Sequence, residues 1–370
     1  MLVSYPHGHL PLTYLCLSVA HAQPESSRDA KRARYRAGAP DAIPSPTRCR
    51  ELALELDPER VFLDFLSSSR RGRNNDEHFA VHVQTEPLPP KSFIRIGAIG
   101  RTAIYVASPE LVFMQLAQRR PLEEAVYFGF ALCSLYRIDP TALGGLRQRD
   151  ECLLSSAEYV IADNPLTTVK RIENFLDTAK GNLGCKKARS ALKFVRDGSR
   201  SPMESALAIT LGLPRIHGGF GLSVGQMNHA VRIFNGTDWA GERLYVTRYP
   251  DISIAHTDSS GRKNTVGIDY DGHAFHSTAS ALARDARRRN EIAPIRGFTH
   301  LSINAQEATD FIAFCRFADQ ARRALGIRSL DRCPRNNPTA ADLEKRDAIE
   351  RKQLDLWRKL IYQSDFRRIE

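Results

Sequence analysis

Apolar and polar positions alternate early in the chain and take up helical spacing afterwards. Residues 60–69 and 79–85 alternate as the strands of a small sheet do, and residues 102–107 are a third candidate strand. Ser108 can cap a helix, because proline follows at the first helical position and a glutamate lies in the first turn. Helical spacing then continues to residue 198. The first block is therefore predicted to be a small sheet followed by helices.

The pattern restarts after residue 198 with a second Ser-Pro-x-Glu helix start. Two strand-like segments, a basic helix and a closing strand follow it. In chain order, these five segments are residues 201–213, 244–255, 264–272, 277–297 and 298–303. Helix, strands, helix and strand in this order predict an α/β unit.

A terminal helix is predicted over residues 341–363, where apolar side chains repeat at helical spacing among charged ones. Such a helix would dock on the body of the protein or on a partner, including a second copy of the chain. The polar segment 23–48 is rich in Pro, Gly and Ser and is predicted to be a linker.

Four segments follow from these patterns. They are a poorly defined N-terminal segment with its linker (1–47), a small α+β domain (48–198), an α/β domain (199–330) and a C-terminal helical extension (331–370).

Composition and charge narrow the class of partner. The chain has 370 residues, of which 42% are hydrophobic, so it can form real cores. Its net charge of +11 favours polyanions, with nucleic acid ahead of an anionic membrane surface. We therefore expect the chain to bind DNA and not to bind a membrane.

Cysteine usage and the N-terminus bear on the compartment. The seven cysteines are scattered and form no CxxC pair, so they are predicted to be reduced thiols in the cytoplasm. Residues 10–23 contain a short apolar run followed by Ala20-His21-Ala22, which looks like a signal-peptide cleavage site. No Lys or Arg precedes the run, however, and it is too short to span a bilayer. A cytoplasmic location is therefore favoured.

The segment "VGIDYDGHAFH", residues 266–276, concentrates acids and histidines at the end of an apolar strand. Asp269 and Asp271 are two residues apart, so in a strand they share one face. Asp251 opens the preceding apolar run and would lie alongside if the two strands pair. Converging carboxylates suit Mg²⁺, or Mn²⁺ in its place, which can polarise a phosphodiester. Asp251 and Asp269 are the predicted metal ligands.

A structural alternative stays open for these residues. Asp271 and the glycine after it are typical of a turn that leaves a sheet. His273 and His276 offer the only nearby nitrogen ligands, and a single histidine is more often structural than catalytic. The functional interpretation rests on the acids and histidines as a set.

At this point the chain resembles a known family. The order of "SPMES", "YPDISIA", "VGIDYDGHAFH", "RDARRRNEI" and "GFTHLSI" is similar to the PD-(D/E)XK nuclease superfamily, in the branch of very-short-patch mismatch-repair endonucleases. The resemblance covers residues 201–310. It implies a restriction-endonuclease-like mixed sheet flanked by helices, within the α/β class, and Mg²⁺-dependent hydrolysis of DNA phosphodiester bonds.

The resemblance also implies roles for individual residues. Glu204 matches the glutamate of the first core helix, Asp251 the acid that opens the second strand, and Asp269 the acid on the third. Asp271 and His276 match the acid and histidine of the branch's pattern. Asp269 replaces the usual glutamate, and Asp271 occupies the position of the superfamily's lysine. For Glu204 an alternative role is helix capping.

The basic helix fits the same branch. Asp285 and Arg289 are four residues apart and can pair across one turn, which leaves Arg284, Arg287 and Arg288 for phosphates. A solvated basic face is the alternative.

The N-terminal half resembles another family on residues 88–118, "LPPKSFIRIGAIGRTAIYVASPELVFMQLAQ". This segment is similar to the core of AbiEi-type antitoxins, in which a strand pair leads into a helix, and that family regulates transcription by binding DNA. The resemblance leaves a second function open. The chain could be a non-enzymatic DNA-binding regulator that keeps a nuclease-like scaffold.

Overall fold

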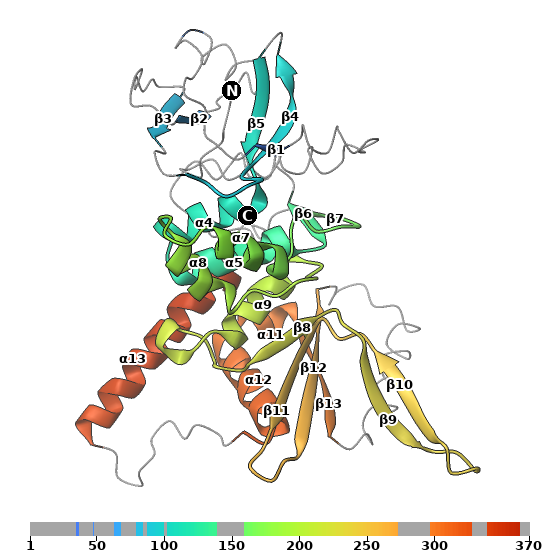
Figure 1. The fold of residues 1–370 in the computed structure, drawn as a ribbon. Helices are drawn as coiled ribbons and strands as arrows, with labels where there is room; N and C mark the ends of the chain where they lie inside the picture. Colours follow the sequence, from blue (N-terminus) through green and yellow to red (C-terminus); the bar gives the residue numbers. More distant parts are fainter. Residues whose placement is uncertain are drawn as a thin grey trace. The chain divides into compact units, whose positions relative to one another are not determined.

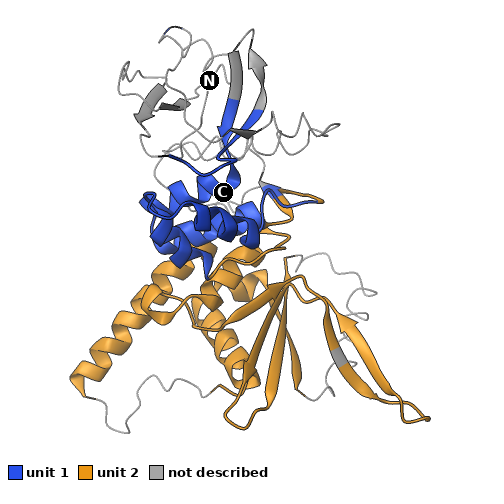
Figure 2. Ribbon diagram, in the orientation of Figure 1, with its two compact units in different colours: residues 1–133, 137–149, 164–193 blue, residues 134–136, 150–163, 194–370 orange. Residues whose placement is uncertain are grey.

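The protein is described from a computed structural model. The structure describes residues 35–36, 47, 63–67, 79–83, 87–99, 102–138, 159–272, 297–327 and 339–362. The chain forms two compact units, shown in Figure 2. Unit 1 comprises residues 1–133, 137–149 and 164–193, and unit 2 comprises residues 134–136, 150–163 and 194–370.

Unit 1 combines small sheets with helices, as the alternation predicts. Strands β4 (Phe93–Ile99) and β5 (Thr102–Ala107) form an antiparallel hairpin, and the short β1 (Tyr35–Arg36) pairs with β4. Strands β2 (Leu63–Ser67) and β3 (Phe79–Val83) pair in parallel in a separate sheet. The predicted strands are therefore present among the described residues, but they belong to two sheets.

Helix α4 (Pro109–Arg119) begins where its capping signal predicts. The Ser108 side chain accepts a hydrogen bond from the amide of Leu111, and proline occupies the first turn. Helix α5 (Leu122–Cys133) follows, and both helices bury nearly all of their side chains.

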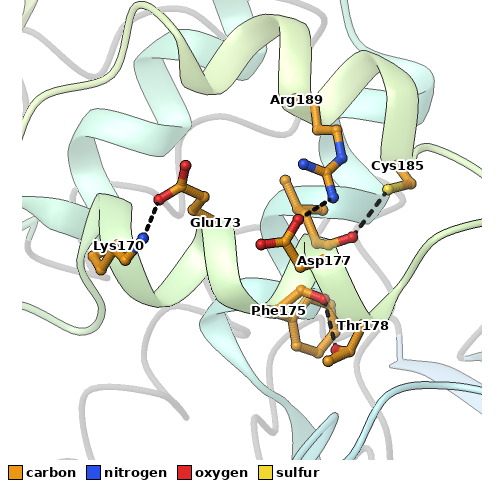
Figure 3. A network of polar contacts seen from close by, with 8 residues as sticks. Lys170, Glu173, Phe175, Asp177, Thr178, Cys185 and Arg189 are labelled. Carbon is orange, nitrogen blue, oxygen red and sulfur yellow. Dashed lines mark hydrogen bonds and ion pairs between the residues drawn. The ribbon is translucent and has the colours of Figure 1, made fainter.

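Helices α7 (Val169–Thr178) and α8 (Cys185–Leu192) pack against α4 in unit 1. Their apolar faces, with Ile172 and Ala188, are buried. Figure 3 shows the polar contacts on this pair, in which Arg189 donates a 2.8 Å hydrogen bond to Asp177 across the two helices. That ion pair is solvent-exposed, so the apolar face contributes more to stability.

Unit 2 contains a four-stranded mixed sheet in the order β8-β11-β12-β13, with α9, α11 and α12 beside it in Figure 1. The strands are β8 (Val224–Met227), β11 (Ile252–Thr257), β12 (Lys263–Asp271) and β13 (Phe298–Asn304). The first two pairings are antiparallel, and β13 runs parallel to β12. Strands β9 (Val231–Thr237) and β10 (Arg243–Arg248) form a hairpin of their own.

The helices of unit 2 are α9 (Pro202–Gly212), the 3₁₀ turn η2 (Arg215–His217), α11 (Ala305–Thr309), α12 (Phe311–Ala324), α13 (Ala340–Trp357) and the π-helical turn η3 (Arg358–Tyr362). Of these, α9, α11 and α12 contact the four-stranded sheet, and α13 contacts α9 and the turns η2 and η3. Helix α9 begins after Ser201, whose side chain accepts from the Glu204 amide. Helix α12 packs on β12 and β13.

The predicted terminal helix docks on the body of its own unit through its last turns. Trp357 donates a hydrogen bond of 2.8 Å to the carbonyl of Ala308, and Gln353 donates one of 3.2 Å to the carbonyl of Gly219. Leu343, in the first turns, is exposed.

The strand-like segment predicted over residues 244–255 divides into two strands, β10 and β11, in different sheets. Pro250 lies at the division, where its missing amide hydrogen interrupts a sheet ladder. The overall class is mixed α/β, as predicted.

The predictions about reduced cysteines and about membrane spans can be compared with the described residues. Cys133, Cys185 and Cys315 are thiols rather than disulfides. Within the described part of the chain, no helix is both long and apolar enough to cross a bilayer. The N-terminal segment 1–22 lies outside the described residues.

Candidate active site

Asp251 and Asp269 lie side by side at one end of the four-stranded sheet. The antiparallel register pairs Ile252 with Ile268. Asp251, which precedes Ile252, therefore lies opposite Asp269, which follows Ile268. The amide of Asp251 donates a hydrogen bond of 3.2 Å to Oδ1 of Asp269. The amide of Tyr270 donates one of 2.7 Å to Oδ2 of Asp251. Each of the two carboxylates therefore accepts a hydrogen bond from a backbone amide of the other's strand segment.

Gly267 on β12 leaves room for Pro250 and Phe298 to pack closely against the strand. A Cβ atom on Gly267 would lie 2.8 Å from Cζ of Phe298 and 3.0 Å from Cβ of Pro250. Only a glycine lets Pro250 approach the strand this closely without a shift of its neighbours. Pro250 directly precedes Asp251, so the close approach helps to set where that carboxylate lies.

Glu204 reaches the same place from the first turn of α9. It is only 7% exposed, and its Oε2 accepts hydrogen bonds from the amide of Arg200 (2.9 Å) and the side chain of Asn228 (2.7 Å). The Ser201 hydroxyl donates to Oε1 at 3.1 Å. Burial, and then the negative charge of Asp251, raise the pKa of Glu204 to about 7. This carboxyl group therefore exchanges its proton close to neutral pH.

Asn228 is a site residue that sequence reasoning missed. It follows β8 with a positive φ of 46°, a conformation that asparagine tolerates better than most residues. Its backbone amide donates a 3.0 Å hydrogen bond to the carbonyl of Asp251. Its side-chain amide donates hydrogen bonds to Oε2 of Glu204 and to the carbonyl of Gly198. No local motif marks it, because its partners Gly198, Glu204 and Asp251 lie more than twenty residues away in the chain.

His300, on β13, is the second residue that was missed. Its Nε2 lies 2.8 Å from Oδ2 of Asp269, and both side chains are largely buried. His300 pairs in register with Gly267, two residues before Asp269 on the parallel strand. The histidine is visible within "GFTHLSI", but only the pairing of β12 with β13 brings it to the acid.

The remaining predicted site residues divide into two groups. Asp271 ends β12 with an exposed side chain, on the face of the strand that carries Asp269. The others lie outside the described residues: His273, His276, Arg284, Asp285, Arg287, Arg288 and Arg289. Glu204, Asp251 and Asp269 are thus the predicted residues that described contacts and charge interactions link together.

The donor chemistry of this cluster fits a hard cation. Asp251 and Asp269 offer carboxylate oxygens, and Mg²⁺ is commonly held by one or two carboxylates with water in its other positions. Across the described residues, no group of three His, Cys, Asp or Glu side chains is arranged to hold a metal ion. Asp251 and Asp269 are a pair of carboxylates on neighbouring strands, and a hydrogen bond from the Asp251 amide to Oδ1 of Asp269 links them.

Comparison of the chain with protein-family models, curated proteins and solved structures gave no match.

Proposed function

We propose that the chain is a metal-dependent DNA endonuclease that hydrolyses phosphodiester bonds at this carboxylate cluster. The observation that carries the proposal is the convergence of Glu204, Asp251 and Asp269 from three different elements. Burial is the larger cause of the raised pKa of Glu204, and the negative charge of Asp251 raises it further. Perturbed carboxyl groups of this kind gather at functional sites more often than in purely structural ones.

The order of the elements supports a restriction-endonuclease-like core. Strands β8, β11 and β12 are the first three strands of the mixed sheet in chain order. The resemblance requires an acid opening the second strand and another on the third, and Asp251 and Asp269 stand at those positions. It also requires a glutamate on the preceding helix, which is Glu204 on α9.

The residues of the cluster divide the work of hydrolysis. Asp251 and Asp269 would hold Mg²⁺ or Mn²⁺, which when bound polarises the phosphodiester and lowers the pKa of a coordinated water. Glu204 would accept a proton from the attacking water, because its pKa of about 7 suits a general base at neutral pH. Asn228 and His300 orient Glu204 and Asp269 through their hydrogen bonds.

The resemblance assigns further roles beyond these contacts. Asp271 and His276 would position the nucleophile or the scissile phosphate, and the basic helix with Arg287 and Arg288 would contact the DNA backbone. These roles rest on motif order alone.

A second candidate function is a non-enzymatic DNA-binding regulator. The observation that favours it is that each acid already accepts hydrogen bonds from the chain: Glu204 from Asn228, Asp251 from the amide of Tyr270, and Asp269 from the amide of Asp251. A network so satisfied can hold a scaffold together without any reaction.

Plasmid nicking separates the two functions. Supercoiled DNA is incubated with the wild type and Asp269→Asn in Mg²⁺ or Mn²⁺, with EDTA as the blank. The substitution keeps the shape of the side chain and removes the charge that attracts the cation, so nicking should fall by orders of magnitude. DNA binding should survive.

The matched control is Asp258→Asn, the same chemical change in the turn between β11 and β12, where Asp258 accepts hydrogen bonds from Ser260 and Arg262. This variant should nick as the wild type does. Equal nicking by Asp269→Asn and the wild type would contradict the proposal. A wild type that binds DNA and never nicks it would favour the regulator.

A further inference from the structure

The β9–β10 hairpin projects from the carboxylate cluster itself. Residues 229–250 lie between Asn228, which holds Glu204, and Asp251. The hydrogen bond of 3.0 Å from the Asn228 amide to the Asp251 carbonyl closes the base of the hairpin. The hairpin forms its own two-stranded sheet and extends away from the four-stranded sheet in Figure 1. The base of the hairpin is therefore joined to the cluster through Asn228 and Asp251.

One face of the hairpin carries an aromatic and arginine ladder, formed by Arg232, Tyr245 and Phe234. The register pairs Tyr245 with Phe234 and Thr247 with Arg232, and paired residues share one face of a sheet. The rings of Phe234 and Tyr245 meet edge to face, with centroids 5.9 Å apart. The guanidinium carbon of Arg232 lies 3.9 Å from the centroid of the Tyr245 ring.

The ladder is exposed to solvent. Phe234 is 46% exposed and Tyr245 is 41% exposed, and Arg232 is exposed beside them. Trp239, at the tip of the same hairpin, is 98% exposed. Large aromatic side chains gathered on one projecting ribbon indicate a binding surface rather than scattered apolar residues.

The charge of the two strands indicates what this surface binds. Their charged side chains are Arg232, Arg243 and Arg248, with no acid in either strand. The acids of the hairpin, Asp238 and Glu242, lie in its turn, where Asp238 accepts hydrogen bonds from backbone amides. Aromatic faces with arginines around them fit a polyanion that also offers flat rings, which is a nucleic acid.

The geometry favours unpaired bases over intact duplex. In a duplex the faces of the bases are stacked on one another, whereas unpaired bases can stack on aromatic side chains and arginine planes. We propose that the Arg232, Tyr245 and Phe234 ladder binds unpaired bases of DNA and holds that strand beside the carboxylate cluster. This inference rests on the proposed function and names the form of DNA which that site would receive.

Binding of the full chain to labelled DNA tests the ladder directly. Fluorescence anisotropy in EDTA, which prevents cleavage, compares an oligothymidylate with a duplex of the same length. Tyr245→Leu removes the aromatic face and should weaken oligothymidylate binding by roughly tenfold. Tyr245→Phe keeps the ring and should bind as the wild type does.

Arginine has its own matched pair. Arg232→Gln should weaken binding and make it less dependent on salt. Arg262→Gln removes the same charge from an exposed position in the turn between β11 and β12, and it should have little effect. Thermal unfolding of each variant checks the fold, which these exposed positions should leave intact.

The outcomes separate the ladder from the nuclease. Loss of oligothymidylate binding in Tyr245→Leu but not in Tyr245→Phe supports the ladder, even if the wild type nicks no plasmid. Unchanged binding in Tyr245→Leu overturns the ladder, and a wild type that still nicks plasmid then leaves the nuclease standing. A wild type without affinity for oligothymidylate at low salt also overturns the ladder.

Discussion

The side-chain amide of Asn228 donates a hydrogen bond of 2.7 Å to Oε2 of Glu204. The residue that follows β8 thus holds a carboxyl group carried by α9, and its backbone amide holds the carbonyl of Asp251. One asparagine with a positive φ connects two of the three acids. Both its side chain and its backbone conformation can be tested separately.

Replacing Asn228 by glycine should remove the side chain and keep the backbone conformation, since glycine adopts a positive φ freely. The hydrogen bond from the Asn228 side chain stabilises the ionised form of Glu204. Without it, the pKa of Glu204 should rise further above its ordinary value. We expect the free energy of unfolding at pH 7 to fall by about 1–3 kcal/mol, measured by urea denaturation.

The comparison variant is Asn228→Ala, which loses the same hydrogen bonds and also strains the backbone, by about 1 kcal/mol more. If alanine and glycine are equally stable there, the positive φ has no cost.

Replacing Glu204 by glutamine should change how stability depends on pH. The folded chain raises the pKa of Glu204 from 4.5 to about 7, so between these values the folded state retains a proton that the unfolded state has released. This retained proton contributes roughly 3 kcal/mol to the free energy of unfolding. The contribution is complete below pH 4.5 and is lost as the pH rises through 7. Glu204→Gln should remove this loss, measured by urea denaturation from pH 4 to pH 8.

Glu344→Gln, at an exposed position on α13, is the matched control and should leave the pH dependence of the wild type unchanged. Parallel curves for Glu204→Gln and the wild type would contradict the raised pKa.

Replacing Gly267 by alanine should destabilise unit 2. The new methyl group would lie 2.8 Å from Phe298 and 3.0 Å from Pro250, so one neighbour must move. We expect a loss of about 1–3 kcal/mol in the free energy of unfolding. Phe298→Leu in the same chain removes the ring atom that clashes and should recover part of the loss. A double variant no more stable than Gly267→Ala would place the strain at Pro250 instead.

Replacing His300 by alanine should leave the largely buried Asp269 without one of its hydrogen-bond partners. Removing one partner of such a pair costs about 1–3 kcal/mol, which urea denaturation measures. His300→Gln supplies another donor of similar reach and should cost less. Equal losses in both variants would show that the ring packs there without holding the acid.

Replacing Arg287 and Arg288 by alanine tests the basic helix, which lies outside the described residues. Phosphate contacts release counterions, so the affinity for duplex DNA should fall steeply with salt, and the double variant should have a slope smaller by about 2. Binding at several salt concentrations measures the slope. An unchanged slope would remove this helix from the contact surface.

The amino-acid sequence alone determined the features that depend on near neighbours in the chain. Ser108 and Ser201 predicted the starts of α4 and α9, because a cap, a proline and a glutamate act within one helical turn. The apolar run before Asp269 predicted β12, and the two-residue spacing placed Asp269 and Asp271 on one face, since that face depends only on the period of a strand.

Only the tertiary structure decided which side chains meet at the cluster. Asp251 faces Asp269 because β11 and β12 pair in one register, and a slip by one residue would separate them. Asn228 and His300 entered the cluster without a sequence signal, since their partners lie on other elements. The ladder of the β9–β10 hairpin also needed the pairing of Tyr245 with Phe234. Register is a property of two strands together, so neither strand's sequence reveals it.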